Sequence, residues 1–505
     1  RLAALDGALD WAAVKAQAGP WVRAVRENPP AFWALERLLT EYPISSDEGL
    51  ALMRLAEALL RVPDAETAIA LTADQLGRAD FDGASDAAMA RLSSAAIALS
   101  KRWLPAEGEA PGLVARVGAR SVVAATLRAV QLLGRQFVLG EGIEDALRRA
   151  EAGRRAQPRL RHSFDMLGEG ARTEADAERY LDSYRHALEA IARRADPARH
   201  PSLNDGLSIK LSALQPRYEP AQHERVMREL VPRVWTLCER AAQASLNLTI
   251  DAEEVERLEL SLDVFEALVA RVGRECPRWE GLGLALQSYQ TRAVELVAEV
   301  AAIARRHGVR LMCRLVKGAY WDSEIKRAQE LGLAGYPVFT RKHRSDVSYL
   351  ACASALFDAD DAVFAQFATH NAGTIAAVLQ MARRRGTARF ELQRLHGMGE
   401  GVYREVLREG SVGCRVYAPV GAHRDLLAYL VRRLLENGAN SSFVHQLADE
   451  SVALDTLLES PLARCAGEGG GPAFAPPPRL YGVARPNSEG LDPAVAAHRE
   501  ALAAA

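Results

Sequence analysis

The residues best suited to chemistry stand where short apolar segments end. Two cations, Arg314 and Lys317, lie in and directly after the apolar run 311–316, and Gly318 follows them. A cation inside an apolar strand is unfavourable unless an anionic or electron-rich group faces it, and glycine lets a backbone or a ligand approach closely. Polar residues end other apolar segments in the same way: Asp165, Glu169, Lys210, Asp251, Gln287, Tyr289, His370, Asn371, Glu391, Gln393, His396 and Tyr417. The repetition favours one shared polar site over separately solvated segment ends.

The charge of these residues indicates what the site binds. Lys210, Arg314 and Lys317, with the adjacent pair Arg432 and Arg433, make the set more cationic than anionic. Such a set favours a carboxylate or phosphate ligand. Adjacent arginines cannot share one face of a helix, so both reach one ligand only by straddling it. The alternative interpretation of this pair is a solvated basic stripe.

Other chemistries are disfavoured by the motifs. His370, His396 and Asp251 have none of the spacings typical of a metal site, and the nearby cations would repel a metal ion, so no metal ligand is assigned. The chain has no G-x-S-x-G hydrolase elbow. It also has no G-x-G-x-x-G motif after an apolar segment, so a redox cofactor would have to bind the repeated segments themselves.

The elements that must position these residues are strands alternating with amphipathic helices. Strands are expected at 164–167, 207–211, 246–250, 283–286, 311–316, 363–368, 389–392 and 414–418, which is the βα repeat of a parallel sheet. This number of units over such a length predicts a (β/α)8 barrel, with a last helix at 424–437. The carboxyl-terminal ends of all strands then meet at one face.

The domain organisation follows from the change of pattern along the chain. Residues 1–155 are predicted to be all-helical, an arm and α-domain for scaffolding or oligomer contacts, before the α/β barrel over 156–447. Residues 448–505 include a Gly- and Pro-rich stretch at 467–478, and are expected to be a linker and tail leading towards another domain.

Composition narrows the class of protein. The 505 residues are 49% hydrophobic and 25% charged with a net charge of -2, which is typical of a globular protein and argues against a dedicated nucleic-acid surface. Six scattered cysteines form no C-x-x-C pair, which fits a reducing cytosol. Neither a signal peptide nor a bilayer-spanning apolar run is present in the sequence.

Several stretches resemble the proline dehydrogenase barrel of the bifunctional proline utilization A flavoproteins. The stretch at 314–328 (RLVKGAYWDSEIKRA) is the most extensive. Others are 164–169 (FDMLGE), 208–214 (SIKLSAL), 367–372 (FATHNA), 395–400 (LHGMGE), 417–421 (YAPVG) and 432–442 (RRLLENGANSS). The resemblance runs in order from 163 to 443, and the first 155 residues are similar to the family's helical arm and α-domain. Residues 485–492 resemble the approach to an aldehyde dehydrogenase domain, and nothing at the N-terminus resembles the ribbon-helix-helix domain of some members.

The resemblance implies oxidation of L-proline to Δ1-pyrroline-5-carboxylate, with FAD as hydride acceptor and a ubiquinone-type membrane quinone as the next acceptor. It implies a cytoplasmic protein with peripheral membrane contact when reduced, and homo-oligomers. No nucleic-acid partner is expected. The alternatives are an FAD-binding redox-sensing or membrane-docking module without efficient turnover, and a non-enzymatic helical scaffold.

The resemblance also assigns roles to individual residues. Arg432, Arg433 and Lys210 would bind the proline carboxylate, and Tyr417 and Leu395 would pack on the substrate ring. Glu169 would pair with Arg432 as a gate, and Asp251 would support the charges. Arg314 would bind near flavin N5 and Gln287 at the pyrimidine end. The remaining cofactor residues would be Val316, Lys317, Gly318, Ala319, Tyr320, Trp321, Thr340, Lys342, His370, Asn371 and Glu436.

Overall fold

The computed structural model describes residues 1, 3–5, 7–29, 137–408, 410, 412–421, 442–467 and 471–504. Within the helical region expected over residues 1–155 it contains the 3-10 turn η1 (Ala3–Leu5), α1 (Trp11–Glu27) and the start of α7 (Ile143–Ala156). The helix expected over 424–437 lies outside the described residues.

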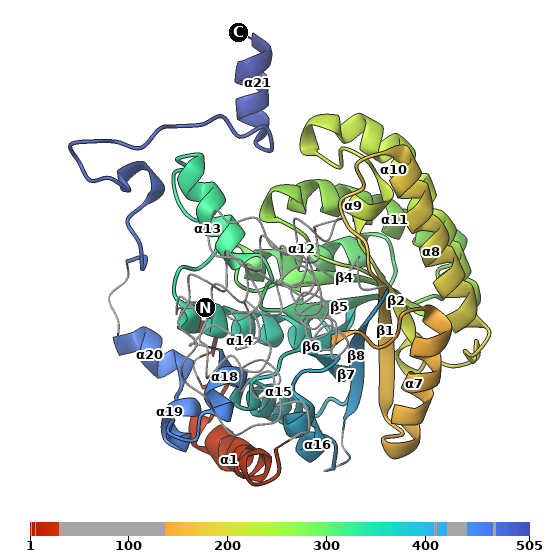
Figure 1. Cartoon of the computed structure of the whole chain (residues 1–505), viewed down its shortest axis with the longest axis vertical. Helices are drawn as coiled ribbons and strands as arrows, with labels where there is room; N and C mark the ends of the chain where they lie inside the picture. Colours follow the sequence, from red (N-terminus) through yellow and green to blue (C-terminus); the bar gives the residue numbers. More distant parts are fainter. Residues whose placement is uncertain are drawn as a thin grey trace, which may run out of the picture.

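Eight parallel strands close into a barrel in chain order, and β1 pairs with β8 to complete it (Figure 1). The strands are β1 (Leu160–Met166), β2 (Gly206–Ile209), β3 (Asn247–Ile250), β4 (Leu282–Gln287), β5 (Leu311–Val316), β6 (Val363–Ala368), β7 (Phe390–Leu395) and β8 (Gly413–Val420). The predicted (β/α)8 barrel is confirmed, and β5 and β6 have the predicted bounds. β1 begins at Leu160 rather than at 164, because Arg161 and His162 interrupt the apolar pattern that the prediction used.

Helices surround the barrel. They are α8 (Glu174–Ala192), α9 (Leu211–Leu214), α10 (His223–Gln243), α11 (Leu258–Glu275), α12 (Ala293–Arg306), α13 (Trp321–Glu330), α14 (Lys342–Asp358), α15 (Ala372–Arg385) and α16 (Glu400–Arg408). Local chemistry sets their ends. A capping box between Thr173 and Asp176 starts α8, and Gly386, at φ 62°, ends α15. None of the helices in these described ranges combines the length and apolarity needed to cross a bilayer.

The interior of the barrel is unusually polar. Arg314 on β5 hydrogen-bonds Ser163 on β1 and Ser208 on β2, so these side chains meet across the barrel axis. Arg415 on β8 and Gln366 on β6 are also fully buried. Interiors of this fold are more often filled by branched apolar side chains. A barrel of this kind could fold with apolar side chains inside, so the polar interior indicates that these residues have a role beyond folding.

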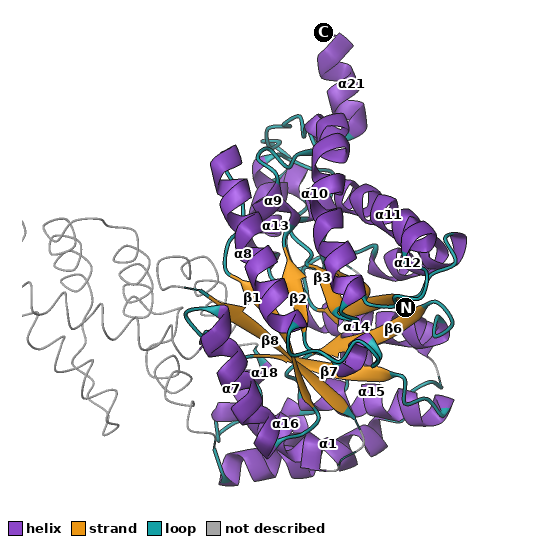
Figure 2. Cartoon of the chain, turned by 90° about the vertical axis from the view of Figure 1, so that its right-hand side faces the viewer, coloured by secondary structure: helices purple, strands orange, loops and turns teal. Residues whose placement is uncertain are grey.

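Segments from both ends of the chain pack on the outside of the barrel. Asp10, before α1, exchanges hydrogen bonds with Gln380 on α15. Arg26 on α1 donates to backbone carbonyls next to the short helix α18 (Phe443–Ala448). Helices α19 (Leu454–Leu457) and α20 (Pro461–Gly467) follow. In Figure 2, α1 lies at the opposite end of the molecule from the C-terminal helix α21 (Ala496–Ala504).

The described C-terminal tail contacts α13. The ring of Phe474 lies 6.1 Å from that of Trp321, at the start of α13. Asp492, which is buried, forms an ion pair with Arg327 on the same helix, with Oδ1 and Nη2 2.7 Å apart. Between these contacts the tail contains the 3-10 turn η6 (Pro477–Arg479). The tail is thus packed against the helix that follows the Gly318 turn.

Candidate active site

Arg314 is the centre of the polar cluster at the carboxyl-terminal half of the barrel. Its side chain is only 3% exposed. Its Nη1 donates to Asp251 Oδ1 at 2.6 Å, and its Nε donates to Gln393 Oε1 at 2.8 Å. The ring of Tyr417 lies 5.2 Å from its Cζ. The expectation that anionic and electron-rich groups face this buried cation is confirmed.

A second buried cation, Lys210, completes the cluster. β2 ends at Ile209, so Lys210 lies at the start of α9 rather than inside a strand as predicted. Its Nζ lies 3.0 Å from Asp165 Oδ1 and 3.4 Å from Asp251 Oδ2. Tyr417 Oη donates to Asp251 Oδ2 at 2.7 Å and lies 3.3 Å from Lys210 Nζ. The structure therefore brings together four predicted residues, Lys210, Asp251, Arg314 and Tyr417.

The protonation states of Lys210 and Tyr417 follow from their surroundings. Burial alone would lower the pKa of Lys210, but Asp165, Tyr417 and Asp251 raise it well above its usual value. Burial, together with Asp165 and Asp251, raises the pKa of Tyr417 well above that of a free phenol. Lys210 is therefore an ammonium group and Tyr417 a neutral phenol at physiological pH.

Next to the ends of β4 and β5, Lys317 and two residues of α14, Lys342 and Asp346, form a group with more positive than negative charge. Gln287 Nε2 donates to the carbonyl of Glu253 at 2.8 Å, and its Oε1 accepts a 3.4 Å hydrogen bond from Ala319 N. Lys317 forms an ion pair with Asp346, and Lys342 lies 4.0 Å from the same carboxylate. Burial opposes ionisation of Asp346, but the two lysines lower its pKa below its usual value. Two partly exposed cations thus share one ionised carboxylate.

The turn at Gly318 requires glycine for a specific reason. Its φ is +137°, and a Cβ built there would lie 2.6 Å from ring atoms of Tyr289. The close approach that glycine was expected to allow is therefore to a buried tyrosine ring. The chain then reaches Ala319, which is exposed, and Tyr320, which precedes α13. Val316, the last residue of β5, is half-buried.

Several residues predicted to bind a cofactor have structural contacts. Asn371 Oδ1 caps α15 by accepting from Thr374 N at 3.0 Å. His370 Nε2 accepts a 3.1 Å hydrogen bond from Leu395 N. On the other flank, Trp321 Nε1 donates to a backbone carbonyl, and Thr340 Oγ1 accepts from Ala473 N of the tail at 2.8 Å. These contacts fix the side chains around the barrel mouth.

Glu169 lies in the loop after β1, where neighbouring backbone groups bond to Ser212. Its predicted partner Arg432, as well as Arg433 and Glu436, lies outside the described residues, so the gate stays a prediction. His396, for which the spacing predicts no role as a metal ligand, lies in the turn after β7. Burial and the charge of Arg394 lower its pKa to about 3, so it is neutral at physiological pH.

Residue patterns did not assign roles to some members of the cluster. Asp165 and Gln393 belong to the predicted polar set but received no individual role, and they contact Lys210 and Arg314 directly. Ser163 and Ser208, which also contact Arg314, were not predicted. The spacing of Glu391 and Gln393 could have indicated that both side chains point into the barrel, because residues two apart on a strand share a face. The contact between Gln393 and Arg314 could not be predicted in this way, because these residues are 79 positions apart.

The fold and the cluster together define a (β/α)8 barrel whose carboxyl-terminal face is suited to charged ligands. Residues 146–446 match the family model described as proline dehydrogenase. Residues 34–137 match a second model, described as the DNA-binding domain of proline dehydrogenase. The chain therefore belongs to the proline dehydrogenase family, and the resemblance identified from the sequence is confirmed. The second description runs against the expectation that the chain has no nucleic-acid partner.

Proteins with similar sequences support this assignment. The chain is 45% identical over 481 residues to bifunctional protein PutA of Escherichia coli (strain K12), covering 91% of this chain and 36% of the relative. It is 27% identical over 317 residues to proline dehydrogenase 1 of Bacillus subtilis (strain 168), covering 62% of this chain and 90% of the relative. The chain thus spans little more than a third of the PutA relatives it matches.

Solved structures agree. A crystal structure of a Bradyrhizobium japonicum proline utilization A variant superposes with a TM-score of 0.74 at 47% identity, covering 97% of this chain and 50% of that one. A proline utilization A from Bdellovibrio bacteriovorus has a TM-score of 0.78 at 22% identity, a likeness of fold.

Proposed function

We propose that this chain oxidises L-proline to Δ1-pyrroline-5-carboxylate, using FAD as the hydride acceptor and a ubiquinone-type membrane quinone as the next acceptor. The observation that carries the proposal is the buried Arg314–Asp251–Lys210 cluster at the carboxyl-terminal face of a barrel that belongs to the proline dehydrogenase family. Enzymes of this fold place their catalytic residues at that face.

The donor set fits a flavin nucleotide. Lys317 and Lys342 share the single carboxylate of Asp346, which leaves positive charge for a pyrophosphate group. Gln287 lies at the end of β4 with its amide orientation fixed by two backbone groups. We assign these residues to FAD, together with Arg314, Val316, Thr340, His370, Asn371, Glu436 and the stretch 318–321. When bound, FAD supplies the atom that accepts the hydride.

The chain's own residues then bind and orient the substrate. Lys210, as an ammonium group, attracts the proline carboxylate, and Arg432 and Arg433 are assigned to the same group. Asp251 fixes the position of both Lys210 and Tyr417. Tyr417 and Leu395 limit the space for the ring. Hydride transfer needs no protein nucleophile, so orientation and charge are the protein's contribution. Glu169 is proposed to close over the substrate by pairing with Arg432.

Reduction of the flavin tests the proposal. The purified chain should be yellow, and its visible flavin absorbance should be lost on anaerobic addition of L-proline and return with a soluble quinone. A colourless chain that takes up no FAD would contradict the proposal. A flavin that is reduced without quinone-dependent turnover would favour the alternative, a redox-sensing or membrane-docking module. We further propose that the protein is cytoplasmic, forms homo-oligomers and contacts the membrane when its flavin is reduced. Co-sedimentation with lipid vesicles in the two redox states tests the membrane contact, and the mass in solution tests the homo-oligomer.

DNA binding is a second candidate function, favoured by the description of the family model that residues 34–137 match. Binding to the phosphate backbone depends on a surplus of lysine and arginine. Residues 34–137 carry slightly more acidic than basic side chains, which weighs against this function. Fluorescence anisotropy with a labelled DNA duplex tests this function. Salt-sensitive binding would establish DNA as a partner, and a titration without any change in anisotropy would contradict DNA binding.

A further inference from the structure

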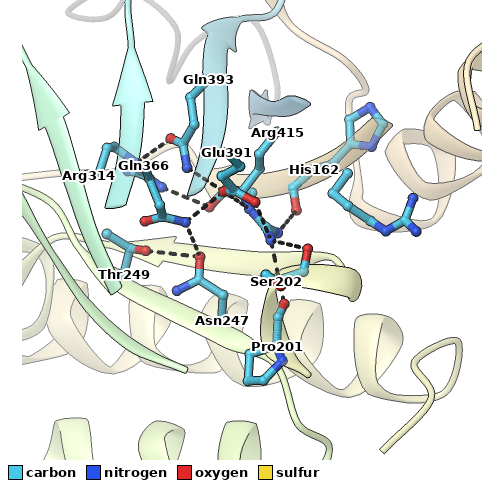
Figure 3. Close-up of polar contacts among 12 residues, drawn as sticks. His162, Pro201, Ser202, Asn247, Thr249, Arg314, Gln366, Glu391, Gln393 and Arg415 are labelled. Atoms are coloured by element: carbon cyan, nitrogen blue, oxygen red, sulfur yellow. Dashed lines mark hydrogen bonds and ion pairs between the residues drawn. The ribbon is translucent and has the colours of Figure 1, made fainter. Parts of the chain in front are cut away.

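The barrel contains a further buried ion pair beneath the proposed active site, between Arg415 and Glu391. Arg415 on β8 is 0% exposed, and its Nε and Nη2 lie 2.7 and 3.2 Å from the two carboxylate oxygens of Glu391 on β7. Its other N–H groups donate to backbone carbonyls, including those of Asn204 at 2.9 Å and Ser202 at 3.1 Å. Arg415 is therefore held on every side, and it fixes Glu391 in turn (Figure 3).

Gln393 joins this deep pair to Arg314. Its Nε2 donates to Glu391 Oε1 at 2.9 Å, and its Oε1 accepts from Arg314 Nε at 2.8 Å. A carboxylate can only accept and a guanidinium can only donate, so the amide has one orientation that satisfies both neighbours. Gln393 is 1% exposed, which leaves it no solvent alternative.

The link has an electrostatic as well as a geometric effect. Among the residues that the structure describes, Arg314 has one anionic partner, Asp251, and otherwise bonds to neutral oxygens of Gln393, Ser163 and Ser208. Because Gln393 is neutral, it holds the Nε edge of the guanidinium without cancelling its charge. An arginine that keeps its charge in a site of low dielectric stabilises negative charge developing nearby.

We propose that Gln393 is a positioning residue for the redox reaction. Because Gln393 is hydrogen-bonded to the Glu391–Arg415 pair, it holds the Arg314 side chain in one orientation, and because it is neutral, it does not cancel the positive charge of Arg314. This inference rests on the proposed function, in which Arg314 faces the flavin. Gln393 itself contacts neither substrate nor cofactor in the proposal.

The test compares Gln393→Met with a matched control, Gln366→Met. Gln366 is equally buried and donates to the same oxygen, Glu391 Oε1, at 2.7 Å, but it hydrogen-bonds Asn247 instead of Arg314. Both changes remove a buried amide of the same size and should lower the melting temperature. Only Gln393→Met should make the flavin harder to reduce and lower kcat, by about tenfold or more, with KM for L-proline nearly unchanged.

The flavin midpoint potential is measured by titration with a chemical reductant, without proline. A parent chain that holds flavin but is not reduced by L-proline would refute the proposed function and leave this comparison intact. Equal potentials in the parent chain and Gln393→Met, or an equal shift in Gln366→Met, would overturn the inference. If Gln393→Met does not fold, Gln393→Glu replaces it. Its introduced carboxylate should weaken the field of Arg314 and lower the potential, with recovery as falling pH protonates it, and an unchanged potential would again overturn the inference.

Discussion

Lys210 is a single side chain that is expected to contribute both to the stability of the fold and to substrate binding. It lies between Asp165 and Asp251, and the side chains of all three residues are buried. Lys210→Met leaves Asp165 buried without its cationic partner, and breaking a buried pair in this way costs about 3–5 kcal/mol. The free energy of unfolding, measured with urea, should fall by that amount, and KM for L-proline should rise.

The control for this prediction removes the orphaned charge as well. Lys210→Met combined with Asp165→Asn should recover part of the lost stability, because an amide is easier to bury than an unpaired carboxylate. If the double variant is as unstable as the two single changes added together, the pair contributes nothing by interacting.

His396 should make stability depend on pH. Its pKa is lowered to about 3 in the folded chain, against about 6.5 when unfolded. Between these values only the unfolded chain takes up the proton, so His396 reduces stability as the pH falls below about 6.5 and has no effect above it. His396→Gln should therefore lose less stability between about pH 7.5 and pH 5, by at most about 2 kcal/mol. Identical losses in parent and variant would show that His396 is not shielded.

At the scale of elements, the turn between β5 and α13 depends on Gly318. A methyl group there would meet the buried ring of Tyr289 and strain the positive φ, so Gly318→Ala should cost about 1–3 kcal/mol and weaken flavin retention. Gly335 lies in the loop between α13 and α14, with nothing within 4 Å of an added Cβ. Gly335→Ala should leave the melting temperature and the flavin content close to those of the parent, and equal effects of the two changes would contradict the role of the turn.

Strands such as β5 and β6 could be predicted because they are largely buried apolar runs, whereas polar residues at the start of β1 hid its first residues. A shared polar site could be predicted from the strand ends, but its hydrogen bonds could not, because they join residues far apart in sequence. Arg314 and Ser163 are 151 positions apart, so only barrel closure reveals that they meet. Lys210 was assigned to a strand because the apolar residues Leu211 and Leu214 continue the pattern into a short helix. The position of Asn371 before an apolar run also suits the helix cap that it forms, while its cofactor role stays a proposal.

At the scale of the whole molecule, the tail and the barrel are connected through α13. Asp492 is buried against Arg327, which also pairs with Glu256 in the turn before α11. Asp492→Ala should cost about 1–3 kcal/mol and increase hydrogen exchange in residues 321–332. A matched exposed pair, Asp455 with Lys15, has Asp455 93% exposed, so Asp455→Ala should change stability by about 0–1 kcal/mol. Unchanged exchange in α13 would show that the tail contact does not support this helix.

The net charge of the buried cluster also affects which ligands the barrel is expected to bind. Arg314, Lys210 and Arg415 are matched one for one by Asp251, Asp165 and Glu391, so these six side chains are electroneutral together. An amino-acid zwitterion leaves that neutrality unchanged, whereas a simple carboxylate adds one unmatched charge. We therefore expect total charge to distinguish the proposed substrate, the L-proline zwitterion, from simple carboxylates. Since salt screens net charges far more than buried, internally matched ones, the affinity for a zwitterion should hardly respond to ionic strength.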